Sequence, residues 1–115
     1  SVSLLNIQSI NDFQKKIDKK VEISRFRGNI CIDGIKPWEE REWMGKTIKI
    51  NNISFKVEKN IPRCVAINLK PTTDDNSLNL LQSLKKNYNH FEMGIYLTAL
   101  DDGEINLDDK VEIII

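Results

Sequence analysis

Apolar and polar residues alternate over several short stretches of the chain, and this pattern predicts β-strands. The clearest case is a pair of stretches, 46–50 and 53–57, that flank Asn51-Asn52. Asparagine tolerates the positive φ angles that a two-residue hairpin turn requires, so we expect an antiparallel hairpin here. Other short apolar stretches predict strands at residues 1–7, 30–32, 65–69, 93–100 and 110–115.

Two stretches instead carry apolar residues three or four positions apart, which is the spacing of one helix face. The first runs from about residue 10 to residue 19 and follows Ser9, which we expect to be its N-cap. The second runs from about residue 78 to residue 87 and follows Ser77. The proline and glutamates of segment 37–44, which also holds both tryptophans, predict one further helical turn.

Six or seven short strands and two or three short helices, without regular alternation, predict a mainly β fold. We expect a mostly antiparallel barrel or sandwich with the helices attached to it. A chain of 115 residues is the size of one domain, so residues 1–115 are expected to form a single unit. Because the chain begins with serine rather than methionine, we expect a processed product or a piece of a longer protein.

The composition narrows the classes of partner. Seventeen Lys and Arg balance seventeen Asp and Glu, so the formal net charge is zero. Nucleic acids and anionic membranes are bound by clustered basic residues, and we expect neither as the main partner. The longest apolar runs, such as 111–115, are too short to cross a bilayer. Two cysteines, Cys31 and Cys64, make no disulfide framework, which favours reduced thiols and a cytoplasmic location.

Three polar residues at alternate positions form the first candidate site. In an extended segment, Arg25, Arg27 and Asn29 would project from one face and present guanidinium and amide donors. Such a face can recognise an anion, most simply a phosphate. The alternative is a solvated strand edge, where charged residues are common.

The second candidate is the Arg63-Cys64 pair. A neighbouring cation favours the thiolate, which is the reactive and metal-binding form of cysteine. A soft thiolate suits a transition metal. The alternative is that Cys64 is a small buried apolar residue, and this is the role we expect for Cys31, which lies between Ile30 and Ile32.

The remaining candidates carry weaker signals. His90 is the only histidine, which excludes a multi-histidine zinc site and favours a hydrogen-bonded structural residue. The acidic residues between positions 101 and 109 lack the spacing of an EF-hand, so we expect solvated turns there.

These segments, in this order, resemble the MOSC domain, a module of molybdenum-cofactor sulfurases and of the mitochondrial amidoxime reducing components. Arg25-Phe26-Arg27-Gly28-Asn29-Ile30 resembles the RFR-x-N-I segment of the family, and Ile61-Pro62-Arg63-Cys64 resembles its R-C segment. The stretch HFEMGIY, from His90 to Tyr96, is similar to the G-H-x-D-F-G-V-Y stretch of bacterial members. Further similar segments are 38–45, 71–72 and 103–111.

The resemblance implies a MOSC-like β-barrel that binds the molybdenum cofactor (molybdopterin) as part of a small-molecule oxidoreductase. Cys64 would be the metal ligand and the catalytic residue. The partners would be a small-molecule substrate and an electron-transfer or desulfurase protein. The cofactor-binding residues that the resemblance implies are Arg25, Arg27, Asn29, Arg63, His90 and Tyr96.

Two alternatives stay open: a sulfur carrier that holds a persulfide on Cys64, and a non-catalytic protein–protein module. The sequence also departs from the family pattern. Lys70 stands where the family has an aspartate before the proline, and Asp108 replaces a glycine. Cofactor-binding members usually carry an N-terminal half of similar size, and this chain is expected to lack it.

Overall fold

The computed structural model describes residues 2–50, 52–73, 75, 77–101 and 111–114. Over these residues the strands are β1 (Val2–Asn6), β2 (Ile30–Ile32), β3 (Thr47–Ile50), β4 (Ile53–Pro62), β5 (Glu92–Ala99) and β6 (Val111–Ile114). Two α-helices accompany them, α1 (Ile7–Ile17) and α2 (Leu80–Tyr88). Three short 3₁₀-helices complete the described elements: η1 (Ile23–Phe26), η2 (Glu39–Trp43) and η3 (Val65–Asn68).

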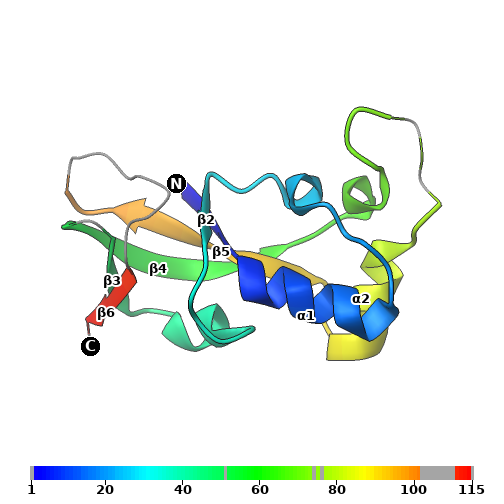
Figure 1. The fold of residues 1–115 in the computed structure, drawn as a ribbon. Helices are drawn as coiled ribbons and strands as arrows, with labels where there is room; N and C mark the ends of the chain where they lie inside the picture. Colours follow the sequence, from blue (N-terminus) through cyan, green and yellow to red (C-terminus); the bar gives the residue numbers. More distant parts are fainter. Residues whose placement is uncertain (1, 51, 74, 76, 102–110, 115) are drawn as a thin grey trace.

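The six strands form one sheet in the order β2-β1-β5-β4-β3-β6. Only the β1–β2 pair is parallel, and the other neighbours run antiparallel. The sheet curls into a half-barrel, with α1 and α2 together at one end (Figure 1). The predicted mainly β fold with short helices is therefore confirmed.

The predicted hairpin is also confirmed. Ile50 pairs with Ile53 across the turn, and Asn52 has a φ of 66°. Asparagine adopts this left-handed conformation at little cost, so the turn needs no glycine.

Side chains of β1 alternate between two apolar clusters, one on each face of the sheet. Leu4 packs with Trp43 and the apolar residues of β3 and β4 on one face. Leu5 packs on the other face, where Phe13 of α1, Leu84 of α2 and residues of η1 and η3 cover the sheet. This second cluster joins η1 to η3, and these two elements carry the candidate site.

Two sequence predictions differ from the structure, the strand at 65–69 and the serine N-caps of the two helices. Segment 65–69 is the 3₁₀-helix η3 and not a strand, because only Ile67 of η3 reaches the core while Val65 and Ala66 are exposed. The N-caps of α1 and α2 are Asn6 and Asn79, whose side chains accept backbone N–H bonds. The acidic turn expected at 102–109 lies outside the described residues.

Glu40 of η2 is a fully buried carboxyl group. It accepts hydrogen bonds from Asn6 Nδ2 at 3.0 Å and from Ser9 Oγ at 2.9 Å. Ser9 is therefore not a helix cap; it links α1 to η2 and also accepts a bond from Trp38 N at 2.7 Å. Burial raises the pKa of Glu40, which its hydrogen bonds only partly offset.

The raised pKa of Glu40 predicts a pH-dependent stability. The folded protein keeps the Glu40 proton above pH 4.5, the ordinary value, so the free energy of unfolding should fall as pH rises from there through the folded pKa. Each pKa unit of that difference corresponds to about 1.4 kcal/mol. Denaturant titrations between pH 4.5 and 8 should show this decrease, and Glu40→Gln should remove it. An unchanged slope in the variant would assign the decrease to another group.

Candidate functional site

The end of β4 is fastened to η1 by the side chain of Arg63. Its guanidinium donates to Phe26 O at 2.7 Å and to Met93 O at 2.8 and 3.0 Å. Pro62 has no N–H to give the sheet, and the β4–β5 register shifts beside it, so the guanidinium supplies donors that the ladder lacks. Arg63 is thus turned inward, and burial lowers its pKa.

Arg25 also points inward, which contradicts the expected extended segment. Residues 23–26 form a 3₁₀ turn, so Arg25 and Arg27 do not share a face. The Arg25 guanidinium pairs with Glu22 at 2.6 Å and donates to Ile67 O at 3.1 Å and Asn68 O at 3.0 Å. Arg25 therefore donates hydrogen bonds to two carbonyl groups at the C-terminal end of η3. In this geometry its role is to hold η1 against η3.

Arg27 is exposed and lines a cavity of ≈ 170 Å³ between η1 and the segment that follows η3. Within the described chain its guanidinium has no hydrogen bond or ion pair. We call this cavity the Arg27 pocket. Its lining residues are Ser24, Arg25, Arg27, Ala66, Leu69, Lys70, Pro71 and Thr72.

The backbone of the Arg27 pocket is held in an unusual conformation at two points. Arg27 has a φ of 48° and Thr72 a φ of 62°. Left-handed conformations cost energy, above all for a β-branched residue, and such residues are concentrated at binding sites. With Lys70 as a second cation, the pocket has the chemistry to hold a small anion. The sequence analysis identifies Lys70 only as a departure from the family pattern and Thr72 only within a family-like segment, so neither is among the predicted site residues.

Cys64 is exposed and precedes η3 as its N-cap residue. This excludes the alternative that it is a small buried residue. Ala66 and Leu69, which line the Arg27 pocket, lie two and five residues after Cys64, so η3 connects the thiol to the pocket. Arg63, through its bond to Phe26 O, and η3 together connect the segment of the thiol to the segments that line the pocket.

Cys64 should be alkylated faster than Cys31 in the folded protein. Cys31 is partly buried, and burial raises the pKa of its thiol, which lowers its thiolate fraction. Iodoacetamide labelling with peptide mass spectrometry measures both rates. Equal rates would count against Cys64 as the working thiol, whereas in denaturant the two rates should converge.

The other sequence-predicted site residues, Asn29, Tyr96 and His90, do not line the Arg27 pocket. Asn29 Oδ1 accepts from Ser3 N at 2.9 Å and Ser3 Oγ at 3.0 Å, which fastens the start of β2 to β1. Tyr96 of β5 pairs with the same Ser3, so Asn29 and Tyr96 are neighbours across β1. His90 Nδ1 accepts from Glu92 N at 3.0 Å, and burial lowers the pKa of its ring.

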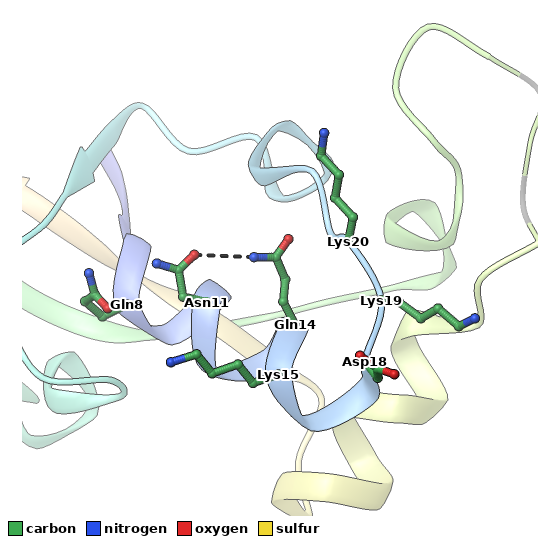
Figure 2. Close-up of a pocket in the computed structure, with 7 residues that line it drawn as sticks. All are labelled: Gln8, Asn11, Gln14, Lys15, Asp18, Lys19 and Lys20. Atoms are coloured by element: carbon green, nitrogen blue, oxygen red, sulfur yellow. Dashed lines mark hydrogen bonds between the residues drawn. The ribbon is translucent and has the colours of Figure 1, made fainter.

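A larger hollow of ≈ 460 Å³ lies along α1, away from Cys64. Figure 2 shows that the side chains of Lys15, Lys19 and Lys20 point in different directions there, so they do not converge on a common ligand position. The hollow is therefore not a candidate site.

Two absences apply to the described residues. They contain no group of three or more His, Cys, Asp or Glu side chains that could hold a metal ion. None of their helices is long and apolar enough to cross a membrane. A metal at this surface would therefore depend on the single thiolate of Cys64 and on ligands that a bound group brings with it.

Comparisons with known proteins show the family of the chain. A profile of the MOSC domain matches residues 1–112. A molybdenum cofactor sulfurase of Drosophila willistoni is 34% identical over 110 residues, which cover 91% of this chain and 13% of that protein. The mitochondrial amidoxime reducing component 2 of Bos taurus is 33% identical over 72 residues, which cover 63% of this chain and 21% of that protein. The chain thus spans a small part of these relatives.

A solved structure is similar over nearly the whole chain. The crystal structure of YiiM from Geobacillus stearothermophilus superposes with a TM-score of 0.72 and 12% identity, covering 98% of this chain and 53% of that chain. At this identity the likeness shows the fold.

Proposed function

Because the chain belongs to the MOSC domain family, we propose that it binds the molybdenum cofactor with Cys64 as the metal ligand. The observation that carries the proposal is that η3 follows an exposed thiol directly and contributes to the lining of a pocket that also holds two cations, Arg27 and Lys70. Relatives named for this cofactor support it. The parent reaction would be the oxidation or reduction of a small molecule.

The residues present fit part of the cofactor. Arg27 and Lys70 suit a terminal phosphate, since guanidinium and ammonium groups both bind phosphate oxygens. The Arg27 pocket, at ≈ 170 Å³, is smaller than the roughly 300–1,000 Å³ of ordinary ligand pockets. It therefore fits the charged end of the cofactor and not the whole molecule.

The contributions of the chain follow from its geometry. When bound, the cofactor would supply two-electron chemistry at molybdenum. Cys64 must lose its proton to bind a metal, and its exposure lets solvent take that proton. Arg63 contributes by position, because it holds the end of β4 against η1.

Metal analysis of the protein made in a host that synthesises the cofactor tests the proposal. We expect molybdenum in the wild type and in Cys31→Ser, and a fall to background in Cys64→Ser. Arg27→Ala should weaken binding of the cofactor by about 1.5–3 kcal/mol, the range for a hydrogen bond to a charged group. Lys56→Ala, an exposed β4 cation, is the matched control. Equal molybdenum in Cys64→Ser and wild type would contradict the proposal.

The exposure of Cys64 also favours a second candidate, a sulfur carrier, because a persulfide must be accessible to its donor and acceptor proteins. Incubation with a cysteine desulfurase and cysteine would then add the mass of one sulfur atom to Cys64. Molybdenum-free protein that gains this mass would favour the carrier over the metal ligand.

A further inference from the structure

Three exposed apolar side chains belong to the segments next to Cys64. Among the described residues, the large apolar side chains that are strongly exposed are Val65 (70%), Leu100 (55%), Leu69 (43%) and Phe91 (43%). Val65 begins η3 and Leu69 follows it directly. Phe91 belongs to the neighbouring segment, since its carbonyl accepts from Arg63 N at 2.7 Å. We call Cys64, Val65, Leu69 and Phe91 the Cys64 surface.

Cations border the Cys64 surface. Lys85 Nζ lies 5.6 Å from the centroid of the Phe91 ring. Arg27 and Lys70 line the pocket that Leu69 also lines. None of these three cations forms an ion pair with another described residue.

Two of the acidic side chains nearby are held in ion pairs, and a third, Asp75, accepts a hydrogen bond from Ser77 N at 2.9 Å. Glu92 pairs with Arg41 at 2.9 Å, and Glu22 pairs with Arg25 at 2.6 Å. The chain has no net charge, but the sequence from 63 to 90 holds four Lys and Arg against two Asp and Glu. The segment that carries the Cys64 surface therefore has an excess of basic residues.

We propose that the Cys64 surface is the docking site for a partner protein that presents apolar side chains within a rim of acidic residues. Exposed apolar residues gathered at one place mark an interaction site, and complementary charge sets its partner. A symmetric contact with a second copy is disfavoured because it would bring Arg27, Lys70 and Lys85 of both copies together. The inference rests on the proposed role of Cys64, because the partner would deliver sulfur or electrons there.

A thiol–disulfide exchange assay measures this docking directly. Two synthetic peptides are compared, one with Glu and the other with Lys flanking the same Leu-Phe-Cys core, each as a mixed disulfide with 2-nitro-5-thiobenzoate. In Cys31→Ser protein, the Cys64 thiolate attacks the peptide sulfur and forms a new disulfide with it. The old S–S bond breaks, and the released aromatic thiolate keeps the electron pair and is measured by its absorbance.

We expect the acidic peptide to react about tenfold faster than the basic one at low ionic strength, with the ratio shrinking in salt. Phe91→Ser and Lys85→Ser should each lower the rate of the acidic peptide about threefold. Leu100→Ser, which removes the exposed apolar residue outside the Cys64 surface, should leave it unchanged. Circular dichroism confirms that each variant is folded.

Equal exchange rates for the acidic and basic peptides would overturn the inference. So would an exchange rate of the acidic peptide that does not change in Phe91→Ser. Sedimentation that shows a dimer lost in Phe91→Ser would overturn it as well, because a second copy would then be the occupant. The assay needs no metal. Protein that shows the acidic preference but binds no molybdenum therefore contradicts only the proposed function, and metal-loaded protein without the preference contradicts only the docking site.

Discussion

Arg63→Ala is expected to lower the free energy of unfolding by about 3 kcal/mol. The substitution removes the donors of Phe26 O and Met93 O, and a hydrogen bond from a charged group contributes about 1.5–3 kcal/mol. Pro62 cannot replace them, since it has no N–H. Urea titration measures the loss.

The role of Arg63 predicts a second effect that a general loss of stability would not produce. Without it the end of β4 is released from η1, so the link between Cys64 and the Arg27 pocket is lost. In protein that remains folded, phosphate affinity at the pocket and molybdenum content should fall together. Arg41→Ala is the control, because its partly exposed pair with Glu92 should contribute less than about 1 kcal/mol. Equal losses in the two variants would contradict the bracing role of Arg63.

Gly94→Ala is expected to destabilise the protein by about 3 kcal/mol or more. Gly94 lies in β5 with a φ of 84°, where a left-handed backbone costs other residues about 1–2 kcal/mol. A Cβ there would also lie 2.8 Å from Leu4 O and 2.8 Å from Leu5 Cδ2, and overpacking of this kind costs about 1–3 kcal/mol. The backbone of β1 cannot move aside without losing its pairing with β5.

Gly34→Ala separates the cost of the left-handed backbone from the cost of the steric clash. Gly34 has the same φ of 84°, but a Cβ there meets nothing within 4 Å. It should therefore show the conformational cost alone, about 1 kcal/mol, and the difference from Gly94→Ala measures the steric clash. Similar losses in both variants would show that β1 and β5 accommodate the added methyl group.

The alternation of apolar and polar residues predicted most strands of the sheet. The alternation at 46–50 and 53–57 depends only on neighbouring residues and on the Asn51-Asn52 turn, so the hairpin could be predicted. Segment 65–69 could not, because its apolar residues serve two purposes: Ile67 fills the core, whereas Val65 and Leu69 stay exposed. A short apolar run does not distinguish these roles.

The candidate site was harder to predict, for a long-range reason. The direction of an arginine depends on which carbonyls lack donors, and for Arg25 these are Ile67 O and Asn68 O, which lie 42 and 43 residues away. The spacing of Arg25 and Arg27 suggested a common face, but the 3₁₀ turn separates them. The exposure of Cys64 likewise follows from η3, which the sequence pattern did not predict.

The position of β1 in the sheet has a consequence for the order in which the chain folds. This first strand lies between β2 and β5, with Leu4 beside both Ile30 and Ile95. During synthesis β1 emerges first, but one of its two neighbours emerges only after about ninety further residues. Pairings this distant in sequence slow folding, because the loop between them must close before any contact compensates for the lost entropy. During synthesis β1 therefore keeps an unpaired edge until β5 has been made.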